Sequence, residues 1–207
     1  MIKFEDYPIL NNHLSTLKDT SIDFHDQDNI QYMTNSERKA VNFDDVKGEY
    51  IEKLSLVEVP KSNDALFMTR DKNGIENKNK EKKESMLIFV EFKNGFMDGK
   101  KKFDVRKKIY DSVIILTDIL DSGISKQRDQ LEYILVYNED VNKGEADVLK
   151  KASYVQPSKA YDALAKTIFG MAKKEYVCFN IDIFKNYCFK DVHTYTEKEF
   201  EEYLERN

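Results

Sequence analysis

Residues 86–93, Met-Leu-Ile-Phe-Val-Glu-Phe-Lys, decide the fold of this chain of 207 residues. The run is apolar from 86 to 90, which predicts a strand that is covered on both faces in the middle of a sheet. Side chains alternate along a strand. The odd-numbered residues 87 to 93, ending in Glu91 and Lys93, therefore share one face, and the even-numbered residues 88 to 92 share the other.

A second strand is predicted just upstream, at residues 65–69, and the chain enters it through Asp64. Between the two strands, residues 70–85 hold an Asp-Lys-Asn-Gly sequence and a charged run in which Ile75 is the only apolar residue. This composition predicts a long hairpin loop with few tertiary contacts. Strands joined by a hairpin are antiparallel neighbours, so we expect Asp64, at the start of one, to lie beside Glu91, at the end of the other.

The remaining pattern alternates between helices and strands. It predicts helices over 36–46, 104–120, 158–173 and 197–205, and strands over 131–137 and 176–183. Residues 50–59 are predicted to form a strand or the end of a helix. The first helix is opened by a Thr34–Glu37 capping box, and Asp104 and Thr196 cap the second and the last. This order is typical of an α/β (α+β) fold with a mixed central sheet flanked by helices. We expect one domain over 1–207: an extension of short helices and loops (1–45), a core (50–137), and C-terminal helices and a strand (138–207).

The composition limits the class of protein and the cellular compartment that can be expected. With 41% hydrophobic residues the chain can bury a core, and no apolar stretch approaches the roughly 18 residues of a membrane span. No leader is visible, and Cys178 and Cys188 make no disulfide framework, so a cytoplasmic protein is expected. The net charge of −5 argues against nonspecific coating of nucleic acid, although residues 100–108 are strongly basic and residues 191–207 strongly acidic.

The pair of Asp64 and Glu91 is the strongest chemical signal. Two converging carboxylates repel each other unless a cation neutralises them, and oxygen ligands of this kind bind Mg²⁺ or Mn²⁺ together with water. A lysine beside them, Lys93, can position or deprotonate a metal-bound water or stabilise charge that develops on a phosphate. The sequence therefore predicts a divalent metal site at Asp64 and Glu91, with Lys93 as a third catalytic residue.

Asp64, then Glu91-Phe92-Lys93 at the end of an apolar strand, then the helix from Asp104, resembles the PD-(D/E)xK nuclease-like superfamily over about residues 50–137. The resemblance implies a restriction-endonuclease-like core in which the acid and the glutamate bind the metal and the lysine assists phosphodiester hydrolysis. It further implies a nucleic-acid substrate, DNA or RNA, and a place in a defence, toxin or restriction-like system. Two features depart from the pattern: no proline directly precedes Asp64, and the interval between the motif halves is long.

The resemblance implies further site residues. Members of this superfamily often carry an additional helical glutamate before the motif, and three residues are candidates here: Glu37, Glu49 and Glu52. Basic side chains near the start of the following helix would face the phosphate backbone of the nucleic acid: Lys102, Arg106, Lys107 and Lys108.

The same residues also have purely structural interpretations. Glu91 and Lys93 can form a weak ion pair where a strand surfaces, Asp64 can cap a turn, and the basic helix can simply be solvated. The competing function is a non-catalytic protein on the same fold, an immunity protein, inhibitor or structural partner that binds another protein. Its support is the acidic balance and the polar, tyrosine-bearing surface. Glycine-rich phosphate loops and Gly-x-Ser-x-Gly are absent from the sequence, so nucleotide triphosphate and serine hydrolysis are unsupported.

Overall fold

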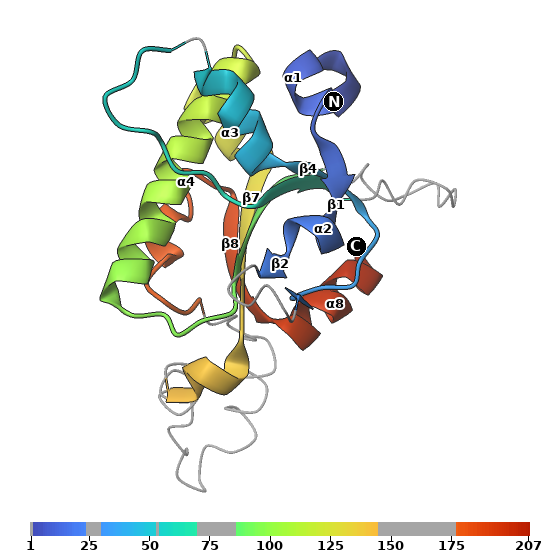
Figure 1. Ribbon diagram of the computed structural model, residues 1–207, viewed down its shortest axis with the longest axis vertical. Helices are drawn as coiled ribbons and strands as arrows, with labels where there is room; N and C mark the ends of the chain where they lie inside the picture. Colours follow the sequence, from blue (N-terminus) through green and yellow to red (C-terminus); the bar gives the residue numbers. More distant parts are fainter. Residues whose placement is uncertain (1, 24–29, 53, 70–85, 145–176) are drawn as a thin grey trace, which may run out of the picture.

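A six-stranded mixed sheet forms the centre of the protein (Figure 1). The computed structural model describes residues 2–23, 30–52, 54–69, 86–144 and 177–207. The strands of the sheet lie in the order β1-β4-β5-β6-β7-β8. Their bounds are β1 Leu14–Thr16, β4 Lys39–Asn42, β5 Ala65–Met68, β6 Leu87–Lys93, β7 Leu131–Tyr137 and β8 Asp191–Thr196, and a separate pair is formed by β2 Ile22–Asp23 and β3 Gln31–Tyr32. The predicted α/β class is confirmed.

Strand β6 lies inside the sheet between an antiparallel and a parallel neighbour. It pairs antiparallel with β5, with Ala65 opposite Val90, and parallel with β7 and through β7 with β8. The register places Asp64, directly before β5, next to the end of β6. The prediction that these two strands are antiparallel neighbours is therefore confirmed.

Helices cover both faces of the sheet (Figure 1). Helices α3 (Phe43–Ile51) and α4 (Gly99–Ile119) lie on one face, and α2 (Leu17–Thr20) and α8 (Glu197–Arg206) lie on the other. The shorter elements are η1 Phe4–Asp6, α1 Pro8–Asn11, α5 Ile124–Arg128 and η3 Asp182–Phe184. None of the helices in the described part of the chain combines the length and apolarity that a membrane crossing requires.

The two faces of β6 belong to two different hydrophobic clusters. Leu87 and Phe89 pack in the cluster that includes the inner stripe of α4, whereas Ile88, Val90 and Phe92 pack in the cluster that includes the inner side of α8. This is the alternation that a strand covered on both faces requires. Glu91 follows Leu87 and Phe89 and is therefore directed toward α4.

Helix α4 begins earlier than the sequence pattern indicated. Asp98, not Asp104, is its N-cap, and the Asp98 carboxylate accepts a hydrogen bond from the Lys101 backbone N–H at 2.7 Å. The predicted start was wrong because a cap needs only one oxygen at the right place and the run of three lysines continues the helix. As a result Lys108 lies well inside the helix rather than on its first turn.

Several other predicted elements differ from the structure. The helix expected over 36–46 is instead strand β4 followed by α3, which is capped by the Asn42 side chain, and Thr34 donates to Glu201 on α8 rather than closing a capping box. Residues 54–64 form neither strand nor helix, and no strand is found over 177–183. By contrast, β7 and α8 match their predicted ranges, and α8 has a complete capping box between Thr196 and Glu199. The predicted hairpin loop at 70–85 and helix at 158–173 lie outside the described residues.

Candidate active site

Glu91 is a fully buried carboxylate at the end of the central strand. Its side chain has no exposure to solvent, and both Lys108 and Lys93 pair with its Oε1 atom, Lys108 at 2.6 Å. Its other oxygen, Oε2, is buried without a hydrogen-bond partner among the described residues. Burial and the nearby Asp64 carboxylate raise the pKa of Glu91, and the two lysines oppose that rise. An ionised group in such a place is costly unless its surroundings compensate the charge.

Asp64 lies beside Glu91 and shares a lysine with it. Its Oδ2 atom accepts a hydrogen bond of 2.7 Å from the backbone N–H of Phe92, and its Oδ1 atom lies 2.9 Å from the Lys108 ammonium. The side chain is 17% exposed, so Asp64 lies between the buried Glu91 and solvent. The structure thus brings the two acids of the sequence motif together at one ammonium group.

Lys108 joins the two acids from helix α4. Its side chain is only 19% exposed, and although burial disfavours the ammonium, Glu91 and Asp64 together raise the pKa of Lys108 well above that of a free lysine. Sequence reasoning grouped this residue with the basic side chains that either face a phosphate backbone or are solvated, and did not place it beside the acids. The available signal was the phase of α4, since Val105, Ile109 and Ser112 beside it are all buried.

Helix α4 also fixes the segment that leads into Asp64. The Lys61 backbone N–H donates to the Asp111 carboxylate at 2.7 Å, and the Lys61 ammonium pairs with Asp104 at 2.6 Å. The Asn63 backbone N–H donates to the Ser112 hydroxyl at 2.8 Å. These contacts hold residues 61–64 along the helix. Asp64 is thereby positioned by α4 as well as by its own strand.

Lysine side chains gather at the exposed side of the site. Lys93, which is 22% exposed, extends from β6 and pairs with Glu91. The pKa of the Asp104 carboxyl is lowered by its hydrogen bond from Lys61 and further by the charges of Lys100 and Lys93. Lys61 therefore contacts the Asp104 carboxylate directly, and the positive charges of Lys93 and Lys100 also act on it.

Tyr133 on β7 adds a neutral polar group. The side chain is fully buried, and its hydroxyl has no hydrogen-bond partner within the described residues. Burial raises the pKa of Tyr133 strongly, and the carboxylates of Glu91 and Asp64 raise it further. The tyrosine therefore stays protonated near the two acids, with an O–H that is free to donate.

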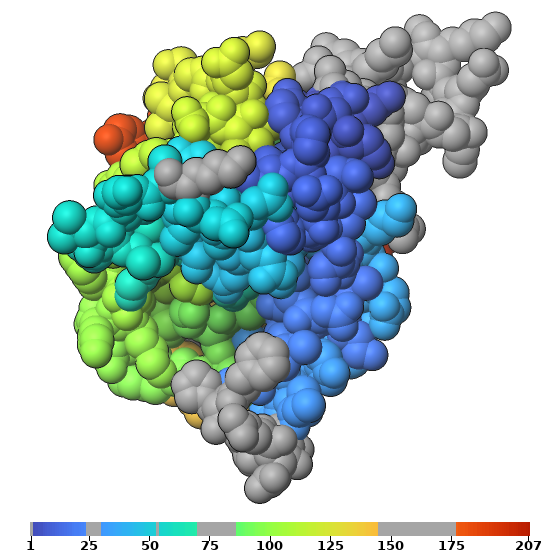
Figure 2. Space-filling model, turned by 45° about the horizontal axis from the view of Figure 1, so that its top comes forward, coloured from blue at the N-terminus to red at the C-terminus, as the bar shows by residue number. Residues whose placement is uncertain are grey.

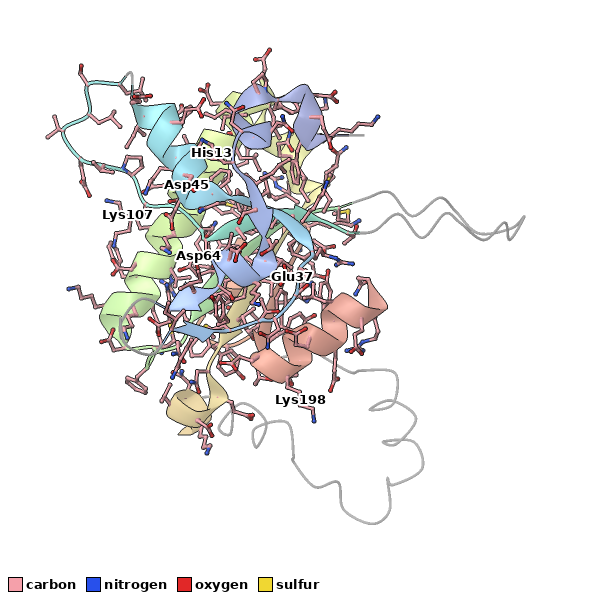
Figure 3. The ribbon with its side chains drawn as sticks, turned by 45° about the vertical axis from the view of Figure 1, so that its right-hand side comes forward. His13, Glu37, Asp45, Asp64, Lys107 and Lys198 are labelled. Atoms are coloured by element: carbon pink, nitrogen blue, oxygen red, sulfur yellow. The ribbon has the colours of Figure 1, made fainter. Side chains whose placement is uncertain are left out.

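The basic residues predicted to contact nucleic acid are engaged elsewhere. Lys102 lies over the Phe179 ring at 5.9 Å, Arg106 donates to the Asn180 carbonyl at 3.1 Å, and Lys107 pairs with Glu58. In Figure 3, Lys107 lies on the outer side of α4, apart from Asp64. The structure does not bring these three residues to the pair of acids.

The candidates for an additional glutamate do not join the site either. Glu37 pairs with Lys18 at 3.5 Å, and Figure 3 shows it apart from Asp64. Glu49 pairs with His13 at 2.8 Å, and Glu52 is an exposed residue at the end of α3. The acid that α3 does bring near the motif is Asp44, which accepts a hydrogen bond from the hydroxyl of Ser62. Sequence reasoning did not select Asp44, although residue 44 lies within the helix predicted over 36–46, because only glutamates were considered for the additional acid.

The two acids fit a metal that needs few protein ligands. Among the described residues no group of three or more His, Cys, Asp and Glu side chains could enclose a metal ion. Mg²⁺, however, commonly takes one or two carboxylates and completes its shell with water and substrate phosphate. Asp64 and Glu91 provide such a pair, and the unpartnered Oε2 of Glu91 is a buried oxygen that lacks a cation or donor.

Comparisons with known proteins do not identify a family for this chain. No protein-family model matches it, and no curated protein or solved structure is significantly similar to it. The case for a function therefore rests on the residues of the site.

Proposed function

We propose that this protein is a metal-dependent nuclease that hydrolyses phosphodiester bonds with Mg²⁺ or Mn²⁺ held by Asp64 and Glu91. The observation that carries the proposal is the convergence of these two carboxylates on one point at the end of the central strand. A simple ion pair at the surface would leave Glu91 exposed, yet its side chain is completely buried. Perturbed acids of this kind concentrate at functional sites because stability alone favours an apolar residue there.

Each residue has a defined role in the proposed reaction. The Phe92 N–H orients Asp64, and burial against α4 fixes Glu91, so both acids present oxygen atoms to the same position. A bound metal would supply Lewis-acid activation of the phosphate and of the attacking water. Lys93, which is partly exposed, donates to a phosphate oxygen or holds the attacking water. The buried hydroxyl of Tyr133, which has no hydrogen-bond partner among the described residues, is available as a further donor.

The lysines around Asp104 support a polyanionic substrate. Lys61, Lys93 and Lys100 come from three separate parts of the chain and act together on Asp104, and Lys93 also pairs with Glu91, while the protein as a whole is negative. Local charge of this kind attracts a phosphate backbone without reading its sequence. We expect Lys100 to contribute more to substrate affinity than Lys107, which is paired with Glu58.

The direct test is cleavage of defined substrates by the wild-type protein. Duplex DNA, single-stranded DNA and single-stranded RNA are incubated with Mg²⁺ or Mn²⁺, with a chelator as the negative control. We expect cleavage of at least one substrate, and a loss of about 10²-fold or more in Asp64→Asn, which keeps the shape of the side chain and removes its charge. Asp140→Asn is the matched control, since Asp140 is 85% exposed and pairs only locally with Lys143. Absence of metal-dependent cleavage on all three substrates contradicts the proposal.

A second candidate function, binding of a protein partner, has its own observation. Val57 and Val59 are exposed on the segment between α3 and β5, and Phe103 and Ile114 are exposed on the outer side of α4. Figure 2 shows the segment spread over the surface beside α4. Apolar side chains grouped in this way are typical of interaction sites.

This candidate predicts a partner whose capture depends on the apolar surface and not on the acids. Val57→Asp should abolish co-purification of a specific protein, whereas Asp64→Asn should leave it unchanged. If neither wild type nor variant retains a specific partner, this candidate is excluded.

A further inference from the structure

The ammonium of Lys108 occupies the place between the two acids that a divalent cation would take. It lies 2.9 Å from Asp64 Oδ1 and 2.6 Å from Glu91 Oε1, so it uses one oxygen of each carboxylate. A metal bound by both acids needs oxygen atoms at about 2.0–2.6 Å. A metal ion and an ammonium group cannot both lie at these distances, because their charges repel and their volumes overlap.

We propose that Lys108 is an internal competitor of the catalytic metal, which must displace the lysine before it can bind Asp64 and Glu91. The inference rests on the nuclease function proposed above and concerns the control of that same site. Without metal, the Lys108 ammonium places its positive charge between the two carboxylates. The site is then assembled and electrically balanced, but it is closed to cations that bind weakly.

The surroundings of Lys108 provide a route for the exchange. Glu91 Oε2 has no partner among the described residues, so this oxygen is available to a cation as Lys108 leaves Oε1. The flexible four-carbon stem of a lysine can then turn its ammonium away. Asp104, four residues earlier on the same side of α4, is 33% exposed and already attracts lysines. The displaced ammonium thus moves toward the side of the site where the phosphate of the substrate is expected.

The competition lowers the apparent affinity for metal. If a cation binds only the form in which Lys108 is displaced, its apparent affinity is reduced in proportion to the fraction of molecules in that form. Removing the Lys108 ammonium should remove its share of this penalty and leave both acids in place, with Lys93 still paired with Glu91 Oε1. The acids of such a variant also repel each other more strongly without metal, so they should favour a dication still more.

The experiment measures Mn²⁺ binding to wild type and Lys108→Met by calorimetric titration. We expect Lys108→Met to bind Mn²⁺ at least about tenfold more tightly, since one full charge no longer competes. Lys198→Met is the matched control, because Lys198 is an exposed lysine on α8, at the opposite face of the sheet (Figure 3). The Mn²⁺ affinity of this variant should equal that of wild type. An affinity of Lys108→Met that equals or falls below that of wild type overturns the proposal.

The binding assay tests the competitor role of Lys108, and the cleavage assay tests the nuclease function separately. If wild type cleaves nucleic acid with Mn²⁺ but Lys108→Met binds Mn²⁺ no better, the competitor role is excluded and the nuclease stands. If wild type cleaves no substrate but Lys108→Met gains affinity, the competitor role stands and the nuclease is excluded. If neither protein binds Mn²⁺, the competitor role is excluded as well.

A measurement on the wild-type chain covers the case in which Lys108→Met does not fold. Acetylation of lysines by a small reagent, followed by mass spectrometry, reports which ammonium groups are accessible. Lys108 should be protected without metal and become reactive as Mn²⁺ is added, whereas Lys143, which is 66% exposed, should react equally throughout. Continued protection of Lys108 over the whole Mn²⁺ titration excludes displacement.

Discussion

The two faces of strand β6 are stabilised in different ways, although both are formed by the same seven residues. Toward α8, Ile88, Val90 and Phe92 form an uninterrupted apolar surface, and the Phe92 ring meets Phe200 edge to face at 5.8 Å. Toward α4, the apolar pattern stops at Phe89 and gives way to Glu91, whose charge is balanced by lysine. The first face needs only shape and apolar area, whereas the second needs defined partners for each charge.

This difference separates stability from function. Replacing a buried ion pair with apolar residues is often neutral or stabilising, so the α4 face is not the arrangement that stability alone favours. The α8 face of β6, in contrast, presents only the apolar side chains Ile88, Val90 and Phe92. Substitutions on one face should therefore change stability, and substitutions on the other should change binding and catalysis.

The largest expected effect is on the apolar face. Phe200→Ala removes a fully buried ring from the contact with Phe92 and should lower the free energy of unfolding by about 3–5 kcal/mol, as measured by urea denaturation. The Mn²⁺ affinity of the folded fraction should not change. A loss of metal affinity in this variant would show that the two faces are coupled.

Lys93→Ala should have the next largest effect, and on catalysis. The lysine acts on water or phosphate, so its removal should slow cleavage by about 10²-fold, while Mn²⁺ binding by the remaining acids persists. Single-turnover cleavage rates and calorimetric titration measure the two quantities separately. An equal loss of binding and cleavage would mean that Lys93 mainly organises Glu91.

Metal should stabilise the protein through the charged face alone. At ten times its Kd, Mn²⁺ should raise the free energy of unfolding by about 1.4 kcal/mol, because it binds only the folded state. Asp64→Asn should lose most of this increase, and Phe200→Ala should keep it. Thermal unfolding of both variants with and without Mn²⁺ measures this increase. If Asp64→Asn keeps the full increase, the metal binds elsewhere.

The smallest effect on stability should come from the N-terminal cap of α8. Thr196→Ala removes the side-chain half of the capping box with Glu199 and should cost about 1 kcal/mol of unfolding free energy. Cleavage and Mn²⁺ affinity should stay at wild-type values. A catalytic defect would contradict the separation of the two faces.

Long-range strand pairing was predictable where local patterns were strong. The apolar run of β6, the polar interval before it and the placement of Asp64 together predicted the antiparallel pair, and β7 and α8 were predicted at nearly their observed ranges. Strands β1 and β4 were missed because strands of three and four residues show too little alternation to be recognised. Strand β8 was missed although its burial alternates, since polar residues such as Asp191 and His193 occupy its half-buried side.

The acids of the candidate site were identified from the sequence, but their lysine partner was not. Asp64 and Glu91 stand at the ends of predicted strands, whereas Lys108 is one of many lysines on α4 and differs from Lys107 only in its angle around the helix. That angle became informative only once the helix was placed on the sheet. The same reason explains why Lys102, Arg106 and Lys107 were chosen as the basic residues of the site.

The contacts between α4 and residues 61–64 also have a consequence for biosynthesis. The partners in these contacts are between 43 and 50 positions apart in the sequence. A growing chain that has emerged only as far as β6 therefore has both acids but neither Lys108 nor the helix that orders Asp64. Because distant contacts of this kind form late, the arrangement of the two acids should arise only after α4 has docked, and an incompletely synthesised chain should lack the proposed nuclease activity.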